Sequence, residues 1–487
     1  MQAPARGYDT WDGFGRTLTE ADVLLQAAYI NKTLNAKLPD NAKYRYLILD
    51  EGWSHTSNNV NWVLSPMAIH LPNPQRFPSS ISDGTLTALS QKLRNDFGLD
   101  LGLWLIKGIT MQAVELNLTL PGPDGAPNRQ GYVAGDIIFE DKRVCDWHLD
   151  VYAINMSHPA AQWYYNWMFN VYGQWGVTYY KVDCIFAANF DESEIVGIRQ
   201  AITSAPRIPY GTVAALSLSP GTHAQVAQAA VAGPNSNSYR ITDDLYDCWN
   251  KAQELNEQKS LAGDCVLHVA QRHIDFVGLI GAVNGSMWPD SRPSWPDMDM
   301  IPVGRFALGT NRSSLLLPSM VRFVVLRWSI GLSPVILTGD LTAIPSGSEI
   351  EHVLGNPFIA EMHQTLTNPR VLHWANISGD NILNNSSRVG TGAWVGDHSA
   401  IDDALYLALF AFSDAYIPAT ADVSSVNVTV SFKELGSPTG LLRYDVQDLL
   451  TGELVESLTP QAQCRCLTMN VQTNDARAFL LIPDEII

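Results

Sequence analysis

The chain has 487 residues, 46% of them hydrophobic and 16% charged, with a formal net charge of -18. This composition is typical of a folded globular protein, and no apolar run approaches the ~20 residues needed to cross a bilayer. Nucleic acids and anionic lipids are bound by clustered Lys and Arg, which this acidic sequence lacks, so we expect a soluble protein with neither partner.

Two features indicate an extracellular protein: the six cysteines form an even set, and N-glycosylation sequons are frequent. The sequons begin at Asn31, Asn117, Asn155, Asn284, Asn311, Asn376, Asn384, Asn385 and Asn427. Because residues 1–6 lack the apolar region of a signal peptide, we interpret the chain as the mature form of a protein secreted by a eukaryotic cell. Cys145 and Cys184 are either a disulfide or two buried thiols, and Cys464-Arg465-Cys466 is too short for a metal site by itself.

The first hundred residues alternate between helical and strand patterns. Residues 7–15 combine aromatic side chains with glycines and aspartates, which we interpret as a loop that curls over a pocket. Helices are predicted over about 19–35 and 82–97, the first from apolar residues at helical spacing. Buried strands are predicted over 44–53 and 99–106, from short apolar runs.

A further buried strand, over 176–184, ends in charge. Lys181 and Asp183 are two residues apart and share one face of this strand, while Val182 faces the other way. Burying such a pair is costly unless the charges pair or take part in chemistry. Two interpretations stay open at this point: a structural ion pair, or part of an active site at the carboxyl end of a barrel strand.

The alternation continues to about residue 340 and predicts an α/β protein. The further predicted elements are helices over 160–175 and 192–203 and strands over 210–218, 238–244, 295–300 and 334–340. Parallel strands joined by helices close naturally into a (β/α)8 TIM barrel. Carboxylates stand where several strands end, Asp50 and Glu51 among them, so a barrel would bring them to one mouth.

From about residue 374 the pattern changes to short alternating segments between turn residues. These segments cover 404–411, 423–432, 441–448 and 478–482. They predict an antiparallel β-sandwich. We therefore expect a catalytic (β/α)8 barrel over 1–375 and a C-terminal β-sandwich over 376–487, packed tightly because no low-complexity linker separates them.

Two carboxylates facing each other across an aromatic-lined barrel mouth suit glycoside hydrolysis, one as nucleophile and the other as proton donor. Lys181 would keep Asp183 ionised, and a second aspartate in a less cationic, more buried place would hold its proton. Several tryptophans stand in candidate loops where they would stack on sugar rings, namely Trp11, Trp53, Trp104, Trp288 and Trp295. No metal-ligand spacing, P-loop or dinucleotide motif is present, so no cofactor and no metal are expected.

Over almost its whole length the chain resembles the retaining glycoside hydrolases of family 27, the α-galactosidase and melibiase clan. Lys181-x-Asp183-Cys184 is similar to the strand-4 motif of that family, which implies that Asp183 is the nucleophile. Arg240-x-x-x-Asp244 is similar to the strand-6 motif, which implies that Asp244 is the general acid/base and Arg240 a substrate contact.

The resemblance also implies the rest of a substrate-binding set. Asp50 and Glu51 correspond to an acidic pair that binds O4 and O6 of the sugar, and Trp11 to the aromatic floor of the subsite. Asp297 lies in a further motif near the pocket, and Cys145 and Cys184 match a family disulfide. The remaining expected substrate-binding residues are Trp104, Lys181 and Ser217.

Three departures indicate a divergent branch. Glu51 stands where galactosidases usually have Asp, and Gly52 replaces a cysteine of the secreted eukaryotic enzymes. The segment 216–221 lacks the glutamate and tryptophan with which α-galactosidases recognise the 2-hydroxyl, although Ser217 and Ser219 leave room for a larger 2-substituent.

We therefore expect a secreted, retaining exo-glycosidase acting on α-galactoside-like bonds of an oligosaccharide, polysaccharide or glycoconjugate. The alternatives are a β-L-arabinopyranosidase, an α-N-acetylgalactosaminidase, an isomalto-dextranase or a carbohydrate-binding protein without turnover. Retention predicts that the Asp183 and Asp244 carboxyls lie about 5–5.5 Å and at most about 7 Å apart.

Overall fold

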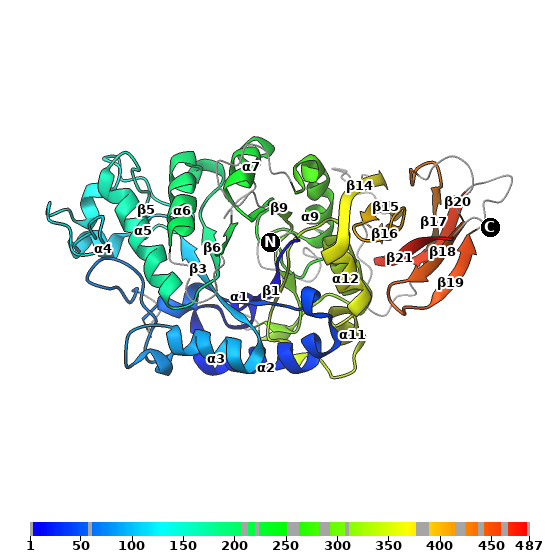
Figure 1. Ribbon diagram of the computed structural model, residues 1–487, viewed down its shortest axis with the longest axis horizontal. Coiled ribbons are helices and arrows are strands. Elements are labelled where there is room, and N and C mark those ends of the chain that lie inside the picture. Colours follow the sequence, from blue (N-terminus) through cyan, green and yellow to red (C-terminus); the bar gives the residue numbers. More distant parts are fainter. Residues whose placement is uncertain are drawn as a thin grey trace.

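The structure is a computed structural model that describes residues 3–56, 61–205, 213–219, 224–250, 263–281, 293–306, 311–375, 389–413, 424–436, 443–458 and 466–484. Two parts lie side by side along its long axis (Figure 1). Helices surround a central group of strands in the N-terminal part, and antiparallel strands form the C-terminal part. Within the described ranges, no helix is long and apolar enough to cross a membrane.

The N-terminal part is a parallel β-barrel. Its strands follow each other in chain order as β1 Arg6–Asp9, β2 Tyr46–Leu49, β3 Asp100–Ile106, β6 Tyr179–Asp183, β7 Ala215–Leu218, β8 Ser238–Arg240, β9 Trp295–Asp297 and β13 Val335–Thr338. The short strand β10 Ile301–Pro302 comes directly after β9 and pairs with β13, which in turn pairs with β1. The two ends of the sheet therefore meet, which confirms the predicted TIM barrel.

Helices cover the barrel, and capping residues begin several of them. They are α2 Glu20–Tyr29, α3 Thr87–Phe97, α5 Pro159–Gln174, α6 Glu192–Ser204, α7 Val226–Ala232, α9 Val266–Arg272 and α10 Pro318–Ile330, followed by α11 Glu349–Leu354 and α12 Pro357–Thr365. A capping box between Thr19 and Asp22 begins α2, and the Asp191 carboxylate accepts two backbone N–H groups at the start of α6. The helix predicted over 19–35 is α2 continued by a π-helical segment, Ile30–Leu34.

The opening segment is not the predicted loop. Residues 6–9 form β1, the first barrel strand, and the short helix α1 Trp11–Phe14 follows it. A Cβ on Gly7 would lie 2.7 Å from the carbonyl oxygen of Tyr46 in β2, so the glycine permits a close approach of two strands. Glycine occurs both in turns and where two backbones pack closely, and Gly7 is an example of close packing.

The C-terminal part is an antiparallel β-sandwich. One sheet has the order β14-β15-β16-β21-β18-β19, and β17 Ser425–Ser431 pairs with β20 Cys466–Gln472 to form the other layer. The bounds of the larger sheet are β14 Leu366–Trp374, β15 Val389–His398, β16 Leu405–Ser413, β18 Arg443–Asp448, β19 Leu454–Leu458 and β21 Asp475–Asp484. Strand β14 belongs to this sheet, so the sheet begins before residue 376, where the second domain was expected to start.

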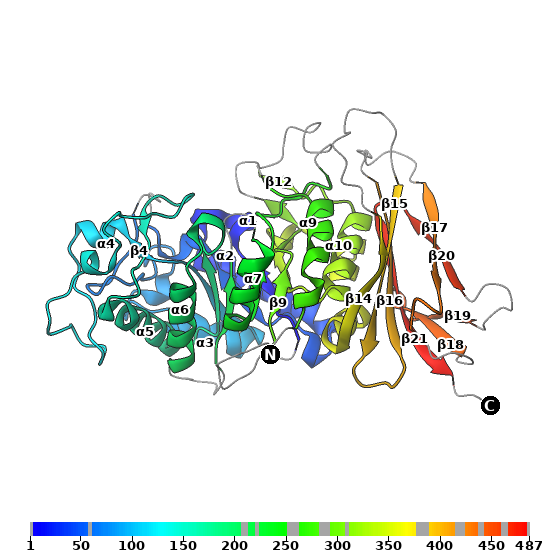
Figure 2. The same ribbon diagram turned by 90° about the horizontal axis from the view of Figure 1, so that it is seen from above.

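Barrel and sandwich share a hydrophobic core. Every residue of β16 is buried, and its Phe410 packs together with Trp374 and with Phe323 of α10. Arg327 of the same helix is fully buried, with its guanidinium 3.9 Å from the ring centroid of Trp394 in β15. From above, β14 and β16 lie beside the barrel helix α10 (Figure 2).

Candidate active site

Acidic residues meet at the carboxyl ends of the barrel strands. Asp9 ends β1, Asp50 follows β2, Asp183 ends β6 and Asp297 ends β9. Since all these strands are parallel, their carboxyl ends form one mouth, the active-site face of this architecture. The predicted convergence of carboxylates is therefore present.

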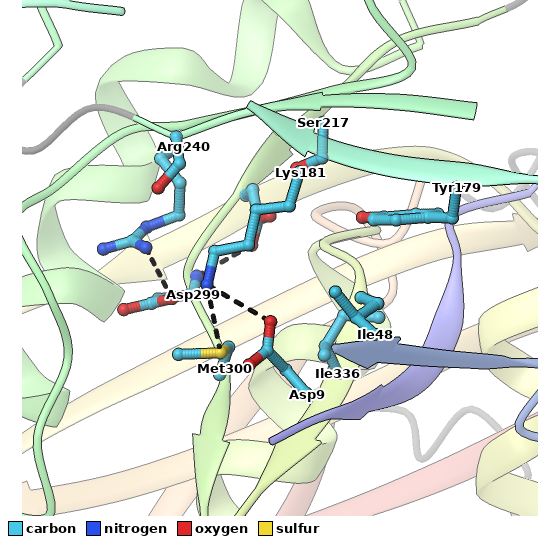
Figure 3. A pocket seen from close by; sticks show the side chains of 11 residues that line it. Asp9, Ile48, Tyr179, Lys181, Ser217, Arg240, Asp299, Met300 and Ile336 are labelled. Atoms are coloured by element: carbon cyan, nitrogen blue, oxygen red, sulfur yellow. Dashed lines mark hydrogen bonds and ion pairs between the residues drawn. The ribbon is translucent and has the colours of Figure 1, made fainter. Parts of the chain in front are cut away.

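Lys181 of β6 lies between two of these carboxylates. Its Nζ donates to Asp9 Oδ2 at 3.2 Å and contacts Met300 Sδ at 3.6 Å (Figure 3). It also donates to Asp50 Oδ2 at 2.8 Å. Burial opposes the charge, but the carboxylates of Asp50 and Asp9 outweigh it and raise the pKa of Lys181 well above its ordinary value. The lysine thus closes an ion-pair network across β1, β2 and β6.

Asp183 is held by neutral donors rather than by the lysine. Its Oδ2 accepts the indole N–H of Trp104 at 3.1 Å, and its Oδ1 accepts the backbone N–H of Cys184 at 2.8 Å. Cys184 forms a disulfide with Cys145, the pairing implied by the family resemblance. Burial and the charge of Asp244 raise the pKa of Asp183, and Lys181 only partly opposes them. The predicted effect of Lys181 is present, since the ammonium lowers the pKa of Asp183, but burial and the charge of Asp244 outweigh it, and the hydrogen bonds of the ammonium go to Asp9 and Asp50.

Asp244 stands beside a guanidinium and in partial contact with solvent. Arg240 Nη2 donates to Asp244 Oδ1 at 3.0 Å, and the Asp244 side chain is 50% exposed. The same Arg240 pairs through Nη1 with Asp299 Oδ1 at 2.7 Å. The expectation that the second aspartate, Asp244, lies in the more buried and less cationic place is therefore wrong.

A small cavity inside the barrel reaches this group of charges. Asp297 and Asp299 line it together with Lys181, Arg240 and Ser217 (Figure 3). The backbone N–H of Asp299 donates to Asp297 Oδ1 at 2.8 Å. Burial raises the pKa of Asp297, and burial followed by the opposing effect of Arg240 leaves the pKa of Asp299 at about 7.

Glu51 is buried and is clamped on one oxygen. Its Oε1 accepts hydrogen bonds from Arg16 Nη2 at 2.5 Å and His148 Nε2 at 2.7 Å. Burial opposes its charge, but these two donors outweigh it, so the pKa of Glu51 is lowered. His148 in turn bonds through Nδ1 to Asp150.

The candidate tryptophans divide into two groups. Trp104 is buried and lies parallel to Trp62, with ring centroids 6.3 Å apart, and its indole N–H donates to Asp183. Trp11 is partly buried, and its backbone N–H donates to Asp9 Oδ1 at 3.0 Å. Trp53 is fully buried and donates to the carbonyl of Trp104 at 3.0 Å, and Trp295 is buried in the core, so these two are packing residues. Trp288 lies outside the described residues.

Three site residues were missed by sequence reasoning: Asp9, Arg16 and His148 are absent from the expected set. Asp9 ends a strand like the other carboxylates, but its segment was interpreted as a loop. His148 lies in a loop between β3 and β6, and no pattern in the neighbouring sequence predicts its contact with Glu51. Nearby, Asp146 lies close to two sulfurs, but these form the Cys145–Cys184 disulfide and are not thiolate ligands.

Comparison with known proteins identifies the fold. No protein-family model and no curated protein sequence matches the chain. A family 27 β-L-arabinopyranosidase from Geobacillus stearothermophilus has a similar structure, with a TM-score of 0.75 and 23% identity over 99% of this chain and 97% of that one. A putative α-N-acetylgalactosaminidase from Bacillus halodurans has a TM-score of 0.72 and 22% identity over 99% and 97% of the two chains.

A more distant match is α-galactosidase I from Mortierella vinacea, with a TM-score of 0.63 and 16% identity over 98% of this chain and 96% of that one. These structures share both the barrel and the C-terminal β-sandwich region with the present chain, since the matches span nearly all of it. The chain therefore has the fold of the family 27 glycoside hydrolases, which confirms the resemblance indicated by its motifs.

Proposed function

We propose that this protein is a retaining exo-glycosidase that cleaves terminal α-galactoside-like bonds. The observation that carries the proposal is the pair Asp183 and Asp244 at one barrel mouth. Asp183 is fixed by two neutral hydrogen-bond donors, Asp244 is half exposed beside Arg240, and the charge of Asp244 acts on the pKa of Asp183. A double-displacement mechanism requires two carboxyl groups in different surroundings, one as nucleophile and the other as acid/base.

In the first step the Asp183 carboxylate attacks the anomeric carbon, and the bond from that carbon to the leaving oxygen breaks. Asp244 gives its proton to this oxygen, and a covalent glycosyl-enzyme forms. In the second step Asp244 takes a proton from water, whose oxygen attacks the anomeric carbon and releases Asp183. The surrounding carboxylates stabilise the positive charge that develops on the ring in both transition states.

Interaction between the two carboxylates supports the division of roles. When both are ionised they repel each other, so a proton on one favours ionisation of the other. The hydrogen bonds of Asp183 from Trp104 and Cys184 favour its charged form, whereas the exposed Asp244 can exchange its proton with solvent. Asp183 is accordingly the proposed nucleophile and Asp244 the proposed acid/base.

The glycone is the open part of the proposal, and Glu51 favours a second candidate, a β-L-arabinopyranoside. That sugar has the galactose ring without the hydroxymethyl group. Glu51 is one methylene longer than the aspartate usual in galactosidases, and one of its oxygens is already taken by Arg16 and His148. This arrangement leaves less acceptor capacity for an O6 hydroxyl. The cavity lined by Ser217 and Ser219 makes an α-N-acetylgalactosaminide a further member of any substrate panel.

The test is hydrolysis of four p-nitrophenyl glycosides: α-D-galactoside, β-L-arabinopyranoside, α-N-acetylgalactosaminide and α-D-glucoside. We expect one of the first two to be cleaved, and Asp183→Asn to lose at least about 10⁴-fold in kcat. Asp340→Asn is the matched control, because Asp340 follows the last barrel strand but bonds to Gln26 and Arg305. NMR of the first-formed sugar should show retained anomeric configuration, and an inverted product would contradict the mechanism.

Binding of a sugar with no hydrolysis by either wild type or Asp183→Asn would instead indicate a carbohydrate-binding protein. Affinity for free galactose and L-arabinose, measured by calorimetry, separates this outcome from a misassigned substrate. If neither sugar binds and no glycoside is cleaved, the proposed function is wrong.

We further propose that the protein is secreted and N-glycosylated. The sequon residues Asn117, Asn311 and Asn427 are exposed, and a second disulfide joins Cys248 to Cys265. Disulfides persist in oxidising compartments and are rare in the cytosol. A mass decrease on enzymatic removal of N-glycans from the protein made in its own cells would support secretion, and unmodified asparagines would contradict glycosylation.

A further inference from the structure

A chain of charged groups connects Glu51 to the loop between β3 and β6. Glu51 Oε1 faces His148 Nε2 at 2.7 Å, and His148 Nδ1 faces Asp150 Oδ1. Asp150 Oδ2 in turn accepts the indole N–H of Trp62 at 3.0 Å. Ionised carboxylates accept hydrogen bonds and do not donate them, so an imidazole between two of them satisfies both when each ring nitrogen carries a proton. The geometry therefore describes an imidazolium.

Every charged group around the ring is accounted for among the described residues. Glu51 and Asp150 supply the negative charge, and Arg16, which shares Glu51 Oε1, lies 3.4 Å from His148 Nε2. His55 Nε2 lies 3.7 Å from the same Glu51 oxygen, and burial lowers the pKa of His55 and of His70. Burial also opposes the charge of His148, but the hydrogen bonds to Asp150 and Glu51 outweigh it and raise its pKa to about 9.

The loop that carries His148 is tied to the proposed nucleophile. Cys145 forms the disulfide with Cys184, the residue after Asp183. Asp146 and Asn189 are joined by two hydrogen bonds. The backbone N–H of Asp146 donates to Asn189 Oδ1 at 3.2 Å, and the Asp146 carboxylate accepts from Asn189 Nδ2 at 2.5 Å. The position of His148 is thus fixed relative to the end of β6.

The other end of the chain of charges reaches the ion-pair network of the barrel mouth. The backbone N–H of Glu51 donates to Asp50 Oδ1 at 2.7 Å, and Asp50 pairs with Lys181. Arg16 and His148 both bond to Oε1, and Oε2 has no hydrogen-bond partner in the part of the chain that the structure describes. One carboxylate oxygen is therefore fixed while the other is available to a hydroxyl group.

We propose that His148 is a positioning residue for glycone recognition: as a cation held between Glu51 and Asp150, it fixes the Glu51 carboxylate so that its free oxygen accepts a hydroxyl of the terminal sugar. The inference rests on the proposed glycosidase function, which it deepens by naming the device that orients one specificity contact. Asp150 and the Cys145–Cys184 disulfide help to hold His148 in this position. The ligand is the neutral pyranose ring, through a hydroxyl distant from the reacting bond.

The charge of His148 is the first quantity to measure, because this measurement does not depend on enzymatic activity. NMR of the full chain with ring-labelled histidine should show His148 titrating near pH 9, and Asp150→Asn should move that titration downward. Asp150 is half exposed, so its conservative variant is expected to fold. Titration of His148 near 6.5 in the wild type, or no change in Asp150→Asn, would overturn the inference even if the protein hydrolyses glycosides.

Kinetics on the cleaved glycoside give the second readout. Charge-assisted hydrogen bonds are stronger than neutral ones, so His148→Gln is expected to lower kcat/KM about 10- to 100-fold, chiefly through KM. The alkaline limb of kcat/KM, set in the wild type by loss of the His148 proton, should begin at lower pH in Asp150→Asn. His352→Gln, an exposed histidine of α11, is the control and should leave both parameters unchanged.

The two proposals fail in different ways. If wild type cleaves no glycoside and binds no free sugar, the glycosidase assignment fails, while the histidine titration still reports the charge. If wild type is active but His148→Gln keeps its KM, or loses kcat equally on every glycoside, the positioning role fails and the glycosidase assignment stands. Should His148→Gln not fold, the pH profile of Asp150→Asn decides alone.

Discussion

Replacing Lys181 by methionine tests whether its ion-pair network holds the barrel mouth together. Methionine keeps most of the apolar stem but removes the cation that lies 3.2 Å from Asp9 and 2.8 Å from Asp50. The side chains of those aspartates are 0% and 4% exposed, so water cannot replace the lysine. Breaking a buried ion pair by removing one partner costs about 3–5 kcal/mol, and we expect Lys181→Met to lose that much free energy of unfolding.

The assay is chemical unfolding followed by tryptophan fluorescence at pH 7. Lys92→Met is the matched control, since Lys92 forms an exposed i,i+4 pair with Asp96 and should change the free energy of unfolding by less than about 0.5 kcal/mol. Adding Asp9→Asn to Lys181→Met removes one of the orphaned charges and should recover part of the loss. A loss below about 1 kcal/mol, or no recovery in the double variant, would refute the reasoning.

The sign of the pH dependence gives an independent check on the same variant. The pKa of Lys181 is raised by folding, so its stabilising contribution is present below its unfolded pKa and is lost only as pH rises through the still higher folded value. Wild type therefore keeps the charge of Lys181 at neutral pH and loses its contribution only at alkaline pH. In Lys181→Met the orphaned carboxylates can be neutralised by protonation, so the deficit in unfolding free energy should shrink as pH falls toward 4.

Three further predictions concern other parts of the molecule. Cys145→Ser opens a disulfide with a sequence separation of 39 residues, so the chain-entropy model gives a loss of up to about 4 kcal/mol in chemical unfolding, together with a raised KM as the His148 loop loosens. Burial raises the pKa of Asp299 to about 7, so its ionisation lowers stability as pH rises from 4 to 7, and Asp299→Asn should reduce that fall in unfolding free energy. Arg327 is buried, and its Nε and Nη1 have no hydrogen-bond partner among the described residues, so Arg327→Met should unfold within about 1 kcal/mol of wild type, whereas Arg327→Ala leaves a cavity and should lose about 3 kcal/mol or more.

The fold was predictable because its signals are local. Strand β6 is predicted by its apolar run and helix α5 by its helical periodicity. Parallel strands with helical connections then favour a closed barrel. The segment that became β1 was misjudged because Gly7 carries no side chain that would show a strand pattern. Its role appears only when the neighbouring strand is placed beside it, with no room for a Cβ.

The site was predictable in its members but not in its pairings. Residue spacing shows that Lys181 and Asp183 share a face of one strand, and the motif resemblance singles out Asp244. Spacing cannot show that barrel closure brings Asp9, 172 residues away, within hydrogen-bond distance of the lysine. Nor can it show that His148 reaches Glu51, because that contact depends on how a disulfide-anchored loop is folded. Long-range pairings therefore placed the hydrogen bonds of Lys181 on Asp9 and Asp50 instead of Asp183.

The arrangement of charges that results has a consequence for reactivity. Each cation of the mouth is committed to carboxylates other than the proposed nucleophile: Lys181 to Asp9 and Asp50, and Arg240 to Asp244 and Asp299. A carboxylate locked in a salt bridge would have to break that bridge in order to attack a carbon atom. Asp183 instead keeps two neutral N–H donors, which hold its geometry without neutralising its charge. The ion pairs of the mouth therefore orient the site, and leave its charge available at the one carboxylate that the mechanism needs as a nucleophile.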